Sequence, residues 1–279
     1  MKANKKVNDS IIFIFLLLLA ALFLLPIVIV FINSFKSRFY ISSAPFELPN
    51  SETFVGFENY INGLTSSGFL AAFGRSVFIT VFSVLLIVVC TSMAAWYIIR
   101  VKSKFTKLMY TLFVFSMIVP FQMVMYTMTY VANKVNFDNI VGIVIIYLGF
   151  GVGLSVFMMS GFVKSIPLEI EEAATIDGCN PLQTFFMVVF PILKPTAITV
   201  AILNAMWIWN DYLLPYLILG TDDKTVPVAI QIAMQGAYGS TDYGGFMAML
   251  VFAIIPIIIF YLSCQKYIIK GVVAGAVKG

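Results

Sequence analysis

Histidine is absent from the 279-residue sequence, and cysteine is scarce, with Cys90, Cys179 and Cys264 far apart. Without histidine, a Ser-His-Asp or Cys-His catalytic unit has no base, so enzymes of that class are excluded. No CxxC pair is present, and a zinc or haem site is therefore not expected. Cys90 and Cys264 lie inside apolar runs and are interpreted as buried thiols. We predict a chain with no metal, no cofactor and no catalytic residue.

Charged residues are also scarce. They make up 11% of the chain, whereas apolar residues make up 61% and the mean hydropathy is +1.00. A soluble domain carries roughly 25% charged residues. The net charge of +4 does not indicate a nucleic-acid partner, because the charges lie between hydrophobic segments, as orientation signals do. The composition therefore predicts an all-α membrane protein embedded in the lipid bilayer.

Six apolar segments are long enough to cross the hydrocarbon core, which takes about 20 residues of helix. They are residues 11–32, 76–99, 108–133, 139–163, 195–219 and 243–265. The first follows three lysines, as a signal peptide would, but its uninterrupted length and the lack of a small-residue cleavage motif favour a retained helix. We predict a single transmembrane domain over residues 1–279.

The lysines and arginines are divided unevenly between the two sides of the membrane. If the N-terminus is cytoplasmic, twelve lie inside and five outside. The inside set is Lys2, Lys5, Lys6, Arg100, Lys102, Lys104, Lys107, Lys164, Lys194, Lys266, Lys270 and Lys278, and the outside set is Lys36, Arg38, Arg75, Lys134 and Lys224. Cytoplasmic loops carry the excess of basic residues in membrane proteins. Both termini are therefore predicted to be cytoplasmic.

The largest loop on the predicted inner side, residues 164–194, carries signals for two short helices. Pro167 can open the first helix, and Gly178 suits its C-terminal stop. Asn180 and Gln183 occupy the capping-box positions around a proline and predict the start of the second. Two helices in one loop indicate a docking surface for another protein, although a loop lying on the membrane without a partner would show the same pattern.

A short motif stands in this loop: residues 171–178 read EEAATIDG, and Phe190 and Pro191 follow. This pattern resembles the EAA motif of binding-protein-dependent ATP-binding-cassette (ABC) importer permeases. That motif is Glu-Ala-Ala, three residues, Gly, nine residues, and then an Ile-x-Leu-Pro-like run. Val188 and Phe190 replace the usual Ile and Leu, and Cys179 stands where the family commonly has Ala. These replacements are conservative, so the resemblance holds.

Two further stretches are similar to the carbohydrate-uptake branch of that family, and within it to the smaller permease of the maltose-type heterodimer. They are residues 207–215 (WIWNDYLLP) and 265–279 (QKYIIKGVVAGAVKG). The resemblance implies a six-helix, type I permease architecture in the bacterial cell membrane, forming half of a pathway for a sugar of the di- or oligosaccharide class. It also implies three protein partners: a second permease of six or more spans, a cytoplasmic ATPase dimer and an extracytoplasmic solute-binding protein.

The same resemblance assigns ATPase docking to the EAA-like loop. The residues that it carries over are Glu171, Glu172, Ala173, Ala174, Asp177 and Gly178. In such importers, closure of the ATPase dimer on nucleotide rocks the permease pair between inward-open and outward-open states. The sequence contains no GxxxxGK[ST] phosphate loop. We therefore expect no enzymatic activity in this chain and ATP hydrolysis on a separate subunit.

Asp211 is the charged residue within the predicted spans, and such a residue is a functional candidate because a carboxylate at mid-bilayer costs about 2.5–3.5 kcal/mol. At about 100° per residue, Asn204, Trp207 and Asp211 share one helix face. Their amide, indole and carboxylate suit the hydroxyls and rings of a sugar, so we predict a substrate pathway there. Gln122 and Tyr126 in the third span are further candidates. Alternatively, Asp211 lies near the outer interface and the tryptophans belong to the aromatic belt.

Two other classes of protein compete with an importer permease. A secondary transporter of a small polar solute, working without an ATPase, would need coupling-ion carboxylates near mid-membrane and an inverted repeat. Only Asp211 is available for that role, and no convincing repeat is found. A membrane enzyme would need clustered His, Asp or Glu at a membrane edge, but the acidic cluster at 169–177 belongs to the predicted docking loop. The importer permease is therefore favoured.

Overall fold

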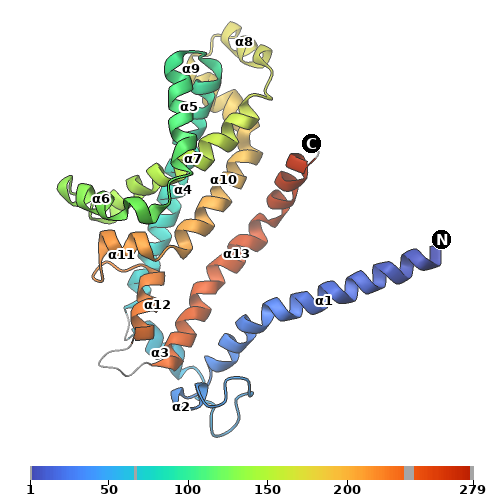
Figure 1. The fold of residues 1–279 in the computed structure, drawn as a ribbon, viewed down its shortest axis with the longest axis vertical. Helices are drawn as coiled ribbons and strands as arrows, with labels where there is room; N and C mark the ends of the chain where they lie inside the picture. Colours follow the sequence, from blue (N-terminus) through green and yellow to red (C-terminus); the bar gives the residue numbers. More distant parts are fainter. Residues whose placement is uncertain (1, 66–67, 236–241, 277–279) are drawn as a thin grey trace. The chain divides into compact units, whose positions relative to one another are not determined.

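The computed structural model describes residues 2–65, 68–235 and 242–276 (Figure 1). Their helices are α1 Lys2–Asn33, α2 Arg38–Ile41, α3 Glu58–Thr65, α4 Phe69–Arg100, α5 Lys104–Ser116, α6 Phe121–Lys134, α7 Ile140–Val163, α8 Leu168–Ile176, α9 Pro181–Gln183, the π-helix η1 Thr184–Val189, α10 Phe190–Asn210, α11 Leu213–Leu219, α12 Val226–Gln235 and α13 Tyr243–Ala276. Within these ranges the extended pairing is a single antiparallel bridge, between Lys36 and Phe54. The predicted all-α class is confirmed.

Five helical segments of the described chain are long and apolar enough to cross a membrane. They are Asp9–Asn33, Phe69–Arg100, Ile140–Val163, Pro181–Asn210 and Tyr243–Tyr267. A bent pair, α5 with α6, makes a sixth if it is counted as one span. Each of the six predicted segments thus has a helical counterpart, but two of the counterparts differ from the continuous helices that the sequence suggested.

The segment predicted at 108–133 is broken in the middle. α5 ends at Ser116 and α6 begins at Phe121, and the axis turns by 109° between them. Pro120 gives the physical reason, because proline has no backbone N–H to continue the helical ladder and disfavours a helical conformation in the residue before it. Pro120 itself adopts an extended ψ of 138° and stands directly before α6.

The segment predicted at 195–219 begins and ends earlier than expected. Its helical run starts at Pro181, and α10 ends one residue before Asp211, whose ψ of 121° is extended. The Asp211 Oδ1 atom then accepts the backbone N–H groups of Leu213 at 3.0 Å and Leu214 at 3.4 Å. A carboxylate that binds the free N–H groups of a first turn starts a new helix. Asp211 therefore lies at the break between α10 and α11, not inside a helix.

The chain divides into two compact units, residues 1–70 with 229–256 and residues 71–228 with 257–279. In the first unit, the chain after α1 is held by Asn59 of α3, whose Nδ2 donates to the carbonyls of Ser34 at 2.9 Å and Lys36 at 2.8 Å. The buried Lys36 Nζ donates to the Ala44 carbonyl at 2.7 Å. Burial lowers the pKa of Lys36, an effect that the charge of Glu47 partly offsets.

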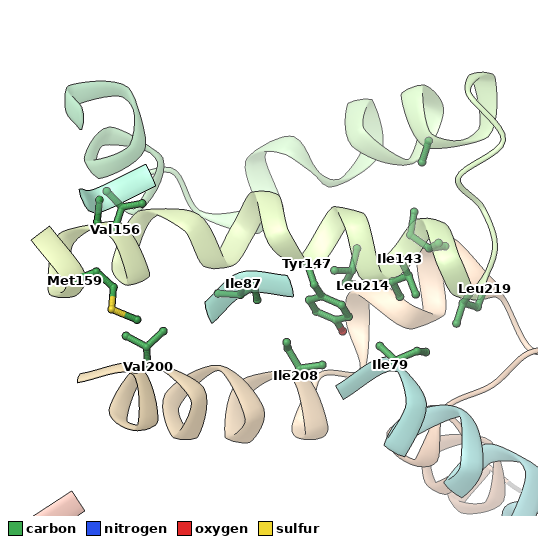
Figure 2. Packing of buried hydrophobic residues seen from close by; sticks show 14 of the residues in the cluster. Ile79, Ile87, Ile143, Tyr147, Val156, Met159, Val200, Ile208, Leu214 and Leu219 are labelled. Carbon is green, nitrogen blue, oxygen red and sulfur yellow. The ribbon is translucent and has the colours of Figure 1, made fainter. Parts of the chain in front are cut away.

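The core of the second unit forms where α4, α7 and α10 pack together (Figure 2). Tyr147 and Met159 project from α7 toward α10 and are fully buried. Val200 and Ile208 of α10 face them. Gly151 permits the close approach of the helices, because a Cβ atom there would lie 2.6 Å from Cδ1 of Ile87 on α4. This core fixes the helices that carry the candidate sites.

Candidate functional site

The EAA-like loop contains the two helix starts that the sequence predicts. Gly178 follows α8 with a φ of +88°, the left-handed conformation that glycine adopts most easily, so the predicted stop is confirmed. The capping box is also present: Asn180 Oδ1 accepts the Gln183 N–H and Gln183 Oε1 accepts the Asn180 N–H, both at 2.9 Å. α8 is therefore a short helix with defined ends (Figure 1).

The second helix of the loop differs from the prediction because it is not short. α9, η1 and α10 follow one another without a break, and the run Pro181–Asn210 qualifies as one membrane span. η1, at Thr184–Val189, is a π-helical stretch inside this run. π-Helical turns are rare and occur often at functional sites. The loop proper is thus α8 with its two connecting segments, and a membrane span begins directly after it.

An apolar cluster packs beneath the loop and fixes it to the rest of the second unit. Its buried members are Val163, Ile166, Phe185, Val189 and Leu193. The Phe185 ring of η1 lies 5.5 Å from the Trp96 ring of α4. The loop therefore rests on the end of α4 and on the end of α7, and it is not a free connector.

The six residues predicted to dock an ATPase divide into two groups. Glu172, Ala173, Asp177 and Gly178 are exposed, as a docking surface requires. Glu171 and Ala174 are each only 7% exposed. Ala174 lies three positions after Glu171, so the two share one face of α8. Two of the six residues, Glu171 and Ala174, therefore face the interior of the protein.

The Glu171 carboxylate binds the end of α4 through three hydrogen bonds. Oε1 accepts from Arg100 Nε at 2.9 Å and from Arg100 Nη2 at 2.6 Å, and Oε2 accepts from Trp96 Nε1 at 2.9 Å. Arg100 Nη2 also donates to the Ile166 carbonyl at 3.0 Å. The ion pair is largely buried, with side-chain exposures of 19% for Arg100 and 8% for Glu171. A buried carboxylate needs such partners, because it has lost its hydration.

The outer surface of the loop combines carboxylates with an exposed apolar side chain. Ile176, the last residue of α8, is 85% exposed. It lies in the same loop as the exposed carboxylates of Glu172 and Asp177. Exposed apolar groups rimmed by charges are typical of a surface that binds another protein.

Tyr147 joins two of the predicted pathway residues. Its hydroxyl donates to Asp211 Oδ2 at 3.1 Å, and its ring meets the Trp207 ring edge-on, with centroids 5.5 Å apart. Trp207 is 41% exposed, so part of its indole remains available to a ligand. The structure therefore places Trp207 and Asp211 around one buried tyrosine of α7.

Asn204 faces the same helix α7 but is a packing residue in this structure. It is 4% exposed, and its Nδ2 donates to Ser155 Oγ at 3.2 Å and to the Val200 carbonyl at 2.9 Å. Gln122 and Tyr126 lie on α6 and are exposed. Among the described residues, neither shares a hydrogen bond with Asn204, Trp207 or Asp211. The structure does not bring all five predicted pathway residues together.

Three residues of these sites were missed at the level of sequence: Tyr147, Trp96 and Arg100. Tyr147 is 64 positions from Asp211, and Arg100 is 71 positions from Glu171. No local motif connects residues so far apart. The one available signal was Arg100 itself, a bulky cation at the end of an apolar span, which in the sequence indicates only orientation.

Comparisons with known proteins agree with this architecture. Two relatives are 37% identical: the probable starch degradation products transport system permease protein AmyC of Thermoanaerobacterium thermosulfurigenes, over 94% of both chains, and the multiple sugar-binding transport system permease protein MsmG of Streptococcus mutans serotype c, over 100% of both. A bacterial ABC transporter involved in the import of the acidic polysaccharide alginate contains a chain with the same fold, at a TM-score of 0.80 and 24% identity, covering 95% of this chain and 97% of that one.

The predicted permease architecture is thus confirmed by a solved structure of the same fold. Residues 87–273, which include α8, the Glu171 network and the Tyr147 group, match a family of membrane transport components. The chain belongs to the family described as binding-protein-dependent transport system inner membrane component.

Proposed function

We propose that the chain is a permease subunit of an ABC importer and forms half of the membrane pathway for a sugar. AmyC and MsmG, whose names refer to starch degradation products and to multiple sugars, match the chain over 94% and 100% of its length. The chain is a multi-pass protein of the bacterial cell membrane and not an enzyme, since ATP is hydrolysed by a separate subunit. A secondary transporter acting alone is not supported, because the family works with a binding protein.

The EAA-like loop is the proposed docking site of the cytoplasmic ATPase. The observation that carries this proposal is the exposed surface of α8 and of the two residues that follow it. Glu172 and Ala173 are exposed on α8, and Asp177 and Gly178 are exposed directly after the apolar side chain of Ile176. Small residues such as Ala173 permit close approach, and the carboxylates offer charge to a basic partner. Glu171 and Ala174 contribute from the inner face, by holding α8 in position.

The proposed substrate contacts are at the break between α10 and α11. There Trp207 presents part of an indole ring and Asp211 a carboxylate, both held by Tyr147. An indole face stacks on sugar rings, and a carboxylate accepts hydrogen bonds from hydroxyls. Gln122 and Tyr126 on α6 are proposed as further contacts because their side chains are exposed, and Asn204 supports the site through its bond to α7.

The proposal is tested by purifying the assembled transporter through a tag on this chain. We expect an ATPase, a second permease and a solute-binding protein in the complex, and ATP hydrolysis that rises when the binding protein carries sugar. Glu172→Lys should lower the stimulated hydrolysis, because it reverses a charge at the contact. Glu52→Lys is the matched control, since Glu52 is also an exposed carboxylate but lies far along the chain from the loop. A chain that purifies without any ATPase would contradict the proposed function.

A further inference from the structure

The connection between α8 and the membrane helices is unusual in its chemistry. Beneath the loop most contacts are apolar, as in the cluster around Phe185. The exception is the Glu171 carboxylate, which three N–H groups of Arg100 and Trp96 hold at 2.6–2.9 Å. Arg100 and Trp96 are four positions apart on α4, so both reach Glu171 from one helix face.

Apolar and polar contacts respond differently when one helix is pushed against another. Apolar contacts have little directional preference, so they do not by themselves hold two helices in one particular orientation. An arginine–carboxylate pair with two N–H groups on the acid has a fixed geometry, and partial burial strengthens it because water screens it less. A displacement of α8 is therefore resisted at Glu171 more than elsewhere along the inner face of the loop.

Arg100 also fixes the segment that leads into α8. The same Nη2 group that binds Glu171 donates to the carbonyl of Ile166, which lies between α7 and α8. One guanidinium group thus binds both the helix and its preceding connector. The other end of α8 is joined through Gly178, whose left-handed conformation permits a change of direction there. Arg100 therefore anchors the N-terminal half of the loop to α4.

We infer that Glu171, Arg100 and Trp96 are the linkage through which movement of α8 is passed to α4 during transport. This inference rests on the proposed function, because it takes the outer face of α8 to be the ATPase contact. Glu171 is then a positioning residue and not a docking residue. Its role is to make α4 follow α8, so that closure of the ATPase moves a membrane helix and is not absorbed within the loop.

The experiment compares sugar imported per ATP hydrolysed in proteoliposomes that contain the assembled transporter. Glu171→Gln keeps the size of the side chain but removes the charge that orders Arg100. We expect this variant to retain its ATPase subunits and hydrolyse ATP, while the import per ATP falls about fivefold. The swap Arg100→Glu with Glu171→Arg should recover part of the loss, and the retained assembly and hydrolysis of Glu171→Gln distinguish a lost linkage from a merely structural defect.

Asp223→Asn is the matched control, because it removes the ion pair of Arg75 with Asp223 near the other end of α4, at 2.8 Å. That pair is more exposed, and exposed pairs contribute little, so import per ATP should be unchanged. An unchanged ratio in Glu171→Gln would overturn the linkage, as would loss of the ATPase subunits, which would make Glu171 a docking residue. A wild-type complex without an ATPase would instead contradict the proposed function.

A second variant keeps the inference testable if Glu171→Gln does not fold and fails to reach the membrane. Trp96→Phe keeps an aromatic ring beside Phe185 and the ion pair of Glu171, and removes the indole N–H together with the five-membered ring that carries it. We expect a fall of about twofold in import per ATP with normal assembly. If this ratio equals the wild-type value, the linkage proposal is wrong.

Discussion

At the scale of the residue, Gly178 shows most directly how one position controls the shape of the loop. Its φ of +88° is one that L-residues rarely adopt, and a Cβ atom added there would meet no atom within 4 Å. A side chain at this position therefore costs backbone strain alone, without a clash. The strain acts between α8 and the beginning of the next span.

The first prediction concerns replacement of this glycine. Gly178→Val should cost about 1–2 kcal/mol, because a β-branched residue in the left-handed region is strained. We expect the transporter to reach the membrane with its partners but to lose most of its stimulated ATP hydrolysis. Gly178→Asn should be milder, since asparagine tolerates this conformation. Full stimulated hydrolysis in purified Gly178→Val complexes would show that the loop shape does not matter for coupling.

The second prediction concerns Tyr147. Tyr147→Phe removes the hydroxyl that donates to Asp211 and leaves the ring against Trp207. Loss of this bond should lower sugar uptake about threefold to tenfold, with normal assembly and basal ATP hydrolysis. Tyr97→Phe, at an exposed tyrosine of α4, is the control and should transport normally. If Tyr147→Phe takes up sugar at the wild-type rate, transport does not require Tyr147 to orient Asp211.

The sequence allowed some of these residues to be found but not their roles. Gly178, Asn180 and Gln183 were predicted correctly because capping depends on neighbours within a few positions. Glu171 could not be distinguished from Glu172, since both are acidic and adjacent. Only the position of Arg100 in three dimensions separates the buried carboxylate from the exposed one.

At the scale of the element, the broken helices are what hydropathy alone could not predict. The high hydropathy of residues 108–133 and 195–219 makes each stretch look like one continuous helix. In the structure the helix is interrupted in both. Pro120 was a local signal for the first break. Asp211 breaks the second by binding the N–H groups of α11, a role that depends on its backbone conformation and not on its hydropathy.

The third prediction concerns the packing of α5 against α7. A Cβ atom at Gly153 would lie 2.6 Å from Met117 Cγ and 2.8 Å from the Phe113 carbonyl, whereas at Gly149 nothing lies within 4 Å. Gly153→Ala should therefore lower the stability of the purified protein by about 1–3 kcal/mol, since overpacking displaces the backbone. Gly149→Ala, on the same helix, should be neutral or slightly stabilising. The midpoints of thermal unfolding in detergent measure both effects, and equal midpoints would show that α5 does not pack on Gly153.

At the scale of the whole molecule, the orientation in the membrane connects the charge pattern to function. Arg100 and α8 lie at one end of the second unit, because Glu171 joins them. Arg75 and Asp223 are paired at the beginning of α4, at the opposite end of the same helix. This arrangement is consistent with Lys102, Lys104 and Lys107 lying on the side of the EAA-like loop. If that side is cytoplasmic, the loop can reach an ATPase.

The fourth prediction tests this orientation with single cysteines in a chain whose three native cysteines are replaced. Glu52, exposed in the segment after the first span, serves as the outer probe, and the exposed Lys104 serves as the inner probe. A membrane-impermeant maleimide should label Glu52→Cys in intact cells, but Lys104→Cys only after the membrane is opened. If Lys104→Cys is labelled in intact cells and Glu52→Cys is not, α8 lies outside the cell, where the cytoplasmic ATPase could not bind it.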